Sequence, residues 1–271
     1  MLVFPNAKLN LGLYITSQRP DGFRNLESVF VPLPWADALE VLPATSETTL
    51  TLTGLPIPGD PATNLCRRAY ELLQADFQLP PVQLHLHKVV PIGAGLGGGS
   101  GDAAFALRAL NDLFSLRLTP DALEAYARRL GSDCAFFIRN QPVFAFEKGD
   151  VFESIALNLT GTACKVVYPG LHISTAEACA RVPPRAPRHD LRAALAQPLD
   201  TWRHTISNDF EEALTPHYPI LGDIKAQLYA AGAAYASLSG SGSAVYGLFP
   251  GLEAPPKLEF PAAYRVWDGQ L

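Results

Sequence analysis

Apolar and polar positions near the start of the chain fall into short runs that are typical of strands. Four runs are rich in β-branched and aromatic residues, and Asp21-Gly22 provides a turn signal between the first two. Runs of this kind bounded by turn residues predict strands. We therefore expect a β-rich beginning, with strands at LGLYIT (11–16), LESVFVPL (26–33), ALEVLP (38–43) and TLTLTG (49–54).

The pattern changes to a helical period from residue 64. One apolar stripe runs along a predicted helix over 64–77 and consists of Leu65, Ala69, Leu72 and Leu73. VQLHLHKVV (82–90) then alternates apolar residues with polar ones, His85 and His87 among them, as a half-buried strand does. Two helices are predicted next, at 102–114 and 121–130. The second has Thr119 as its cap, Pro120 in its first turn and Gly131 at its end.

The second half mixes strands and helices without a regular alternation. Strands are predicted at 142–150 and 165–169, an irregular connection at 183–189, amphipathic helices at 201–214 and 221–232, and strands around a loop at 235–249. This order favours an α+β class over a doubly wound α/β class. The polar, glycine-containing stretch 150–162 is the best boundary, so two domains are expected at 1–156 and 157–271.

Composition narrows the class of protein. With 48% hydrophobic and 17% charged residues, the 271-residue chain is expected to fold into a globular protein. A formal net charge of −5 disfavours a nucleic-acid partner. The four cysteines lack paired spacing, which argues against a zinc site or a disulfide framework and favours a reducing cytoplasm.

Neither hydrophobic stretch of interest looks like a targeting or membrane segment. The N-terminal run has no basic segment before it and contains Pro5, Asn6 and Lys8, unlike a secretory signal. The charge-free stretch 226–252 is interrupted by glycines and serines at its centre. We expect no membrane partner.

The most informative stretch is PIGAGLGGGSGDAA (91–104), which has five glycines in the seven positions 93–99 between a strand and a helix. Glycine permits positive φ and close backbone approach, so successive N–H groups can converge on an anion at the start of the helix. A phosphate-binding loop is the natural interpretation, and a tight connection without a ligand is the alternative.

Other phosphate loops fit less well. Gly93, Gly95 and Gly98 satisfy the dinucleotide pattern, but a second helix follows where that fold needs a second strand. The Walker pattern needs a lysine after the loop, and none is present. The protein-kinase HRD and DFG signatures are absent as well.

Three stretches in this order resemble the three motifs of the galactokinase, homoserine kinase, mevalonate kinase and phosphomevalonate kinase (GHMP) superfamily. They are PNAKLNLGLYI (5–15), the glycine loop, and SLSGSGSAVYGLF (237–249). The resemblance implies a two-domain α+β fold, with an N-terminal α/β domain, a C-terminal ferredoxin-like domain and the active site in the cleft between them. It also implies Mg²⁺ and ATP.

Within the superfamily the chain is most similar to kinases that act on a cytidine-diphosphate-linked methylerythritol. The likeness is carried by PNAKLNLGLYITSQRPDGFRNLES, GLGGGS, LGSDCAFFIRN and SNDFE. It implies phosphorylation of the 2-hydroxyl of that substrate in the non-mevalonate route to isoprenoid precursors. Two alternatives stay open: another acceptor such as homoserine, mevalonate phosphate or a sugar, or a non-catalytic nucleotide-binding protein.

The resemblance assigns roles to single residues. Asp133 matches the catalytic base and Lys8 the lysine beside it, while Asn10 positions the substrate. A carboxylate can accept the hydroxyl proton while an ammonium keeps it ionised. Taken alone, Asp133 would be read as a helix cap and Lys8 as a solvated strand residue.

Further residues match nucleotide and substrate positions of the superfamily. Asn64 and Lys88 match positions near the adenosine, although a helix cap and a solvated strand end are equally good interpretations. The third motif either supports the phosphate loop or approaches the substrate diphosphate, with a plain hairpin as the alternative. The phosphates would lie on Gly93, Gly95, Gly97, Gly98, Gly99 and Ser100, and the third-motif residues are Ser239, Gly240, Ser241 and Gly242.

Three positions depart from the relatives. Phe23 keeps the aromatic that contacts cytosine, but Arg24 replaces the usual histidine. Gly101-Asp102 stands where a second serine is common, so no metal ligand is assigned. Cys179 replaces an aromatic that would sandwich the base. The sequence does not distinguish a monomer from a homodimer.

Overall fold

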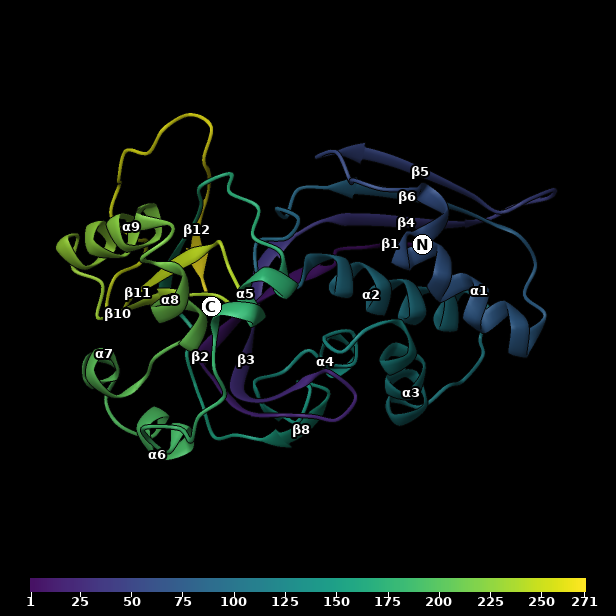
Figure 1. Ribbon diagram of the computed structural model, residues 1–271. Coiled ribbons are helices and arrows are strands. Elements are labelled where there is room, and N and C mark those ends of the chain that lie inside the picture. Colours follow the sequence, from purple (N-terminus) through teal and green to yellow (C-terminus); the bar gives the residue numbers. More distant parts are fainter. The chain divides into compact units, whose positions relative to one another are not determined.

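The computed structural model describes all residues from 1 to 271 and divides them into two compact units (Figure 1). The first unit contains residues 1–7, 35–92 and 97–141, and the second contains 8–34, 93–96 and 142–271. Each unit is therefore assembled from segments that are far apart in the sequence.

The first unit has a four-stranded sheet in the order β1-β4-β6-β5. β5 runs parallel to β6, and the other neighbours are antiparallel. Figure 1 shows α1 (Leu65–Phe77), α2 (Gly98–Leu113) and α3 (Pro120–Leu130) on one side of the layer formed by β4, β5 and β6. The strands are β1 (Leu2–Val3), β4 (Ala38–Pro43), β5 (Thr49–Gly54) and β6 (Val82–Lys88).

Local signals set the helices of this unit. Asn64 and Thr119 cap α1 and α3, since their side chains accept hydrogen bonds from Cys66 N and Ala122 N. Pro120 begins α3, and Gly131 is its C-cap residue, as the sequence predicts. The helices are the 3₁₀ turn η1 (Pro61–Thr63), α1 (Leu65–Phe77), α2 (Gly98–Leu113), α3 (Pro120–Leu130) and α4 (Phe136–Arg139).

The second unit contains two four-stranded sheets. One has the order β2-β3-β7-β8 and the other the antiparallel order β10-β11-β9-β12. β2 starts and β3 ends in residues of the first unit. The strands are β2 (Asn6–Gln18), β3 (Arg24–Ala36), β7 (Val143–Phe146), β8 (Val151–Ser154), β9 (Ala163–Tyr168), β10 (Tyr235–Leu238), β11 (Val245–Phe249) and β12 (Arg265–Gln270).

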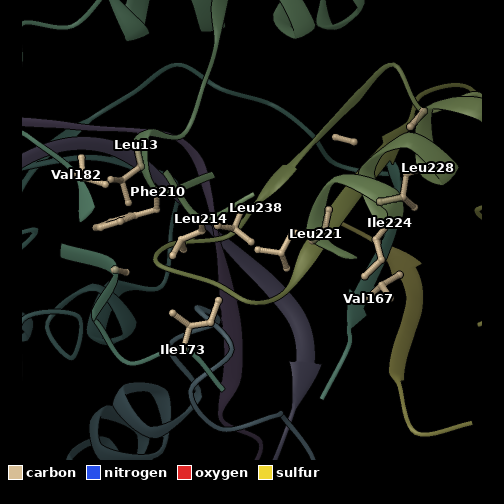
Figure 2. Close-up of a cluster of buried hydrophobic side chains, with 14 of the residues drawn as sticks. Leu13, Val167, Ile173, Val182, Phe210, Leu214, Leu221, Ile224, Leu228 and Leu238 are labelled. Atoms are coloured by element: carbon tan, nitrogen blue, oxygen red, sulfur yellow. The ribbon is translucent and has the colours of Figure 1, made fainter. Parts of the chain in front are cut away.

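A core of buried apolar side chains joins strands of both sheets to three helices of the second unit (Figure 2). Leu13 from β2 lies in the same cluster as Phe210 from α8, Ile224 from α9 and Val167 from β9. The helices are α5 (Thr175–Arg181), α6 (Leu191–Leu195), the 3₁₀ turn η2 (Leu199–Thr201), α7 (Trp202–Thr205), α8 (Asp209–Leu214) and α9 (Pro219–Ala230).

The α+β class is confirmed, and most predicted elements are present, the irregular connection at 183–189 included. The prediction of a single helix over 201–214 is wrong, because residues 206–208 interrupt the helix between α7 and α8. There Ser207 O accepts from Leu13 N at 3.0 Å, and Asn208 caps α8. The connection predicted at 150–162 contains β8, and β12 was not foreseen.

The domain boundary at residue 156 stays a prediction. The two compact units are divided at other residues, since segments 8–34 and 93–96 belong to the same unit as 142–271. None of the helices combines the length and apolarity that a bilayer crossing requires.

Candidate active site

The glycine loop connects β6 to α2 and leaves the start of that helix open. Gly97, the N-cap residue of α2, has φ of 68° and makes no side-chain cap. The first N–H groups of a helix have no partner within the helix, so those of this turn are available to an anion. A Cβ on exposed Gly99 would meet no heavy atom within 4 Å, so space is open above the turn.

The third motif supports the first half of the loop, within the second unit. Ser239 Oγ donates to Gly95 O at 2.9 Å, and Ala244 N donates to Ala94 O at 2.9 Å. Gly95 has φ of 79°, and a Cβ there would lie 1.9 Å from Ser239 O. The residues from Ser239 to Ala244 form the loop between β10 and β11, so this hairpin loop also buttresses the glycine loop.

Lys8 and Asn10 form a buried network on β2 of the same unit. Lys8 is 4% exposed, and its ammonium donates to Asn10 Oδ1 and lies 4.8 Å from the centre of the Phe30 ring. Asn10 Nδ2 donates to Ser28 Oγ at 2.9 Å. The interpretation of Lys8 as a solvated lysine is therefore wrong.

Backbone contacts join this network to both glycine motifs. Lys8 N donates to Leu96 O at 2.9 Å, and Asn10 N donates to Ser239 Oγ at 3.3 Å. Tyr246 OH donates to Asn10 O at 2.7 Å. The second unit thus brings together residues from all three motifs, and sequence reasoning missed Ser28 and Tyr246 because neither lies at a motif position that carries chemistry.

Asp133 lies half-buried in the turn between α3 and α4 of the first unit. The N-cap residue of α4 is Ala135, and it makes no side-chain cap, so Asp133 is not the cap of that helix. The adjacent thiol of Cys134 is hydrogen-bonded with Ser100. Burial raises the pKa of Cys134 to about 12, against the lowering effect of Ser100, so this thiol is neutral. The phosphate turn and the segment of the predicted base are therefore neighbours within the first unit.

Lys88 is buried beneath the first turn of α2, and not solvated. Its ammonium donates to Asp37 Oδ2 at 2.5 Å and to Asp102 Oδ2 at 2.7 Å. Burial acts to lower the pKa of Lys88, but the charges of Asp102 and Asp37 outweigh it and leave the pKa raised. Asn64 caps α1 through its side chain, as the alternative interpretation held.

The turn between β2 and β3 presents Phe23 and Arg24, which the resemblance matches to two cytosine-contacting positions of the relatives. Phe23 is 56% exposed, and Lys148 Nζ lies 5.4 Å from the centre of its ring. Arg24 Nη1 donates to Val182 O at the end of α5. Burial raises the pKa of the Cys179 thiol, which Arg24 partly offsets, so Cys179 and Arg24 face the same region.

Comparisons with known proteins agree with the motifs. The family model described as GHMP kinases N terminal domain matches residues 64–146, and the one described as GHMP kinases C terminal matches residues 190–262. A Bacteroides fragilis protein named 4-diphosphocytidyl-2-C-methyl-D-erythritol kinase is 48% identical over 97% of both chains. One of the same name from Cytophaga hutchinsonii is 49% identical over 92% of both.

Solved structures are similar over nearly the whole chain. A crystal structure of 4-(cytidine 5'-diphospho)-2C-methyl-D-erythritol kinase has a TM-score of 0.82 and 31% identity, covering 99% of this chain and 98% of that one. Homoserine kinase from Cytophaga hutchinsonii has a TM-score of 0.68 at 16% identity, covering 98% and 95%. The second likeness concerns the fold alone.

Proposed function

Because the chain belongs to the GHMP kinases, a family of ATP-dependent small-molecule kinases, we propose that it phosphorylates the 2-hydroxyl of 4-diphosphocytidyl-2-C-methyl-D-erythritol. The observation that carries the proposal is the likeness to a protein of that name over 97% of both chains, at 48% identity. The reaction belongs to the non-mevalonate route to isoprenoid precursors.

In this proposal the triphosphate binds at the start of α2. The N–H groups of Gly98, Gly99 and Ser100 have no partner within the helix, and the helix dipole adds positive potential there. Phosphoryl transfer depends mainly on positioning and charge neutralisation, so a rigid cradle is the principal contribution of the protein. The contacts of Ser239 with Gly95 supply that rigidity.

Asp133 is proposed to accept the proton of the substrate hydroxyl, and Lys8 to offset negative charge during transfer. The amide of Asn10 and the ring of Phe30 hold the Lys8 ammonium in one position. A fixed ammonium stabilises developing charge without reorganisation. Lys8 belongs to the second unit and Asp133 to the first.

Mg²⁺ would be held mainly by the phosphates of the nucleotide. No group of three or more histidine, cysteine, aspartate or glutamate side chains suits a metal ion in this structure. Mg²⁺ commonly keeps several waters and binds one or two carboxylates together with substrate phosphates, which fits this chain. The ion supplies charge neutralisation of the phosphate oxygens.

We place the enzyme in the cytoplasm, with a small-molecule substrate and no nucleic-acid or membrane partner. All four cysteines are free thiols, and three of them are buried, as in proteins of a reducing compartment.

The test of the proposed reaction is ADP release with Mg²⁺ and ATP and a panel of acceptors. We expect turnover with 4-diphosphocytidyl-2-C-methyl-D-erythritol and at least about 10³-fold lower kcat/KM with homoserine, mevalonate phosphate and galactose, because unpaired polar groups in a site penalise the wrong substrate. Turnover with another acceptor alone would support kinase activity but contradict the proposed substrate and pathway. An absence of ADP with every acceptor would refute the proposal.

Arg24 is expected to support the cytidine end of the acceptor by fixing the end of α5. Replacing Arg24 with alanine removes its hydrogen bond to Val182 O and its charge beside Cys179. We expect KM for the acceptor to rise about tenfold, while kcat and the KM for ATP change less than about twofold. Steady-state kinetics with each substrate varied in turn measures this.

The matched control is Arg181→Ala. Arg181 lies one residue before Val182, but its ion pair is with Glu177 of the same helix. An equal rise in KM for both variants would show that helix stability, and not Arg24 itself, sets the effect.

A further inference from the structure

Three charged side chains are buried together under the phosphate turn of the first unit. Lys88 Nζ contacts Asp37 Oδ2 and Asp102 Oδ2, and the side chains are 2%, 0% and 4% exposed. Two carboxylates and one ammonium leave a net negative charge where water is excluded. A buried charge without full compensation is costly, so such a cluster favours holding an extra proton.

The two carboxylates have unequal surroundings. Asp37 receives Lys88 on one oxygen and the N–H groups of Val89 and Val90 on the other, at 2.5 and 2.8 Å. Asp102 accepts from Lys88 on Oδ2, no N–H group donates to its Oδ1, and its carboxyl is also hydrogen-bonded with that of Asp37. Hydrogen bonds from N–H donors stabilise an ionised carboxylate, and Asp37 accepts more of them than Asp102 does. The extra proton of the cluster is therefore expected on Asp102.

Asp102 accordingly titrates near neutrality. Burial raises its pKa to about 7, with Lys88 opposing the rise and Asp37 adding to it. The other titratable group that interacts with it is Cys66 of α1, whose thiol pKa burial raises well above its usual value. That thiol stays neutral, so the charges facing Asp102 are those of Lys88 and Asp37.

The cluster is connected to both ends of the glycine loop. Asp37 holds the N–H groups of Val89 and Val90, which lead into the loop. A Cβ on Gly98, the first residue of α2, would lie 3.1 Å from Lys88 Nζ and 3.0 Å from Val90 Cγ1. The ammonium is therefore packed directly against the phosphate turn, and Asp102 lies one helical turn further along α2.

From this arrangement we propose that Asp102 is a positioning residue that holds Lys88 under the phosphate turn and takes up a proton when ATP binds. The inference rests on the proposed function, in which the triphosphate binds at the start of α2. Phosphates on the N–H groups of that turn would approach α2 about one helical turn before Asp102, and buried charges are screened less than exposed ones. Nearby negative charge favours the neutral carboxyl.

The test is isothermal titration calorimetry of the full chain with Mg²⁺ and ATP, without acceptor, at pH 7.5 in buffers of different ionisation enthalpy. The slope of observed enthalpy against buffer enthalpy gives the protons taken up. We expect roughly half a proton per nucleotide, since a group that titrates near neutrality changes its occupancy most there. Asp102→Asn should lose this uptake and bind ATP within about fivefold of the parent.

The matched control is Asp112→Asn, which changes an exposed aspartate on the same helix and should keep the uptake. Uptake in Asp102→Asn equal to the parent would overturn the inference and leave the proposed function intact. A parent that binds ATP without proton uptake would overturn it even if the variant did not fold. A parent that neither binds ATP nor releases ADP would overturn both.

The protonation of Asp102 can also be tested without nucleotide, through the pH dependence of stability. A carboxyl with a raised folded-state pKa makes the folded state bind more protons, so its contribution to stability is lost as pH rises from about 4 towards 7. We expect the urea midpoint of the parent to fall relative to Asp102→Asn between pH 5 and 8. Parallel curves would contradict the buried proton.

Discussion

Replacing Asp133 with asparagine is expected to lower kcat by about 10³-fold or more while the affinity for ATP stays within about threefold. General base catalysis commonly contributes 10²–10⁴-fold, and an amide cannot accept the hydroxyl proton. Asparagine has nearly the same shape, so the half-buried turn between α3 and α4 should keep its fold. ADP release under saturating substrates and calorimetric binding of ATP measure the two quantities separately.

Asp121→Asn is the control, because it changes an exposed aspartate of the same unit that pairs with Arg139 on the surface. It should leave kcat unchanged within about twofold. If Asp133→Asn kept more than a tenth of the parent turnover, another group would have to accept the proton.

The second large effect is expected for Gly95→Ala. Alanine at φ of 79° costs about 1–2 kcal/mol, and its Cβ would lie 1.9 Å from Ser239 O, a backbone atom that cannot rotate away. We expect the free energy of unfolding to fall by more than about 2 kcal/mol and KM for ATP to rise at least tenfold, because the loop must separate from the third motif. Urea unfolding and initial rates measure these changes.

Gly99→Ala separates the backbone effect from the simple addition of a methyl group. Gly99 lies in α2 with no atom within 4 Å of the added Cβ, so the folded state should gain up to about 1 kcal/mol from helix propensity. If Gly95→Ala changed the free energy of unfolding as little as Gly99→Ala does, the clash with Ser239 would have to be relieved by a small shift of the loop.

Local signals predicted most elements of the fold. Capping side chains, first-turn prolines and glycine stops act over a few residues, so Thr119, Pro120 and Gly131 give the limits of α3 directly. The prediction of one helix over 201–214 was wrong for the opposite reason. Its break depends on Leu13, nearly two hundred residues earlier, whose N–H bonds to Ser207 O. No window of sequence around 201–214 contains that partner.

The three motifs marked residues of the candidate site, but not the contacts among them. Within the second unit Lys8, Asn10 and Ser239 lie in one hydrogen-bonded network with residues 94–96, and the roles that the resemblance assigns to these residues stay predictions. Lys88 could have been predicted as buried, because it continues the alternation of Val82, Leu84 and Leu86 on β6.

Asp37 and Asp102 carried no comparable signal. A lone aspartate after a strand and another one turn into a helix are ordinary surface residues in most sequences. Only the fold brings them to the same ammonium, since Asp37 and Asp102 are 65 residues apart in the sequence and belong to different elements.

The core of the second unit also limits how early the chain can fold during its synthesis. Leu13 and Ile15 leave the ribosome first, but they pack in one cluster with Leu238, Val245 and Phe249. At about 5–20 residues per second, roughly 10–50 s pass before those partners exist. Through that interval the apolar face of β2 has no native cover, so we expect the nascent chain to expose apolar surface until its last strands emerge.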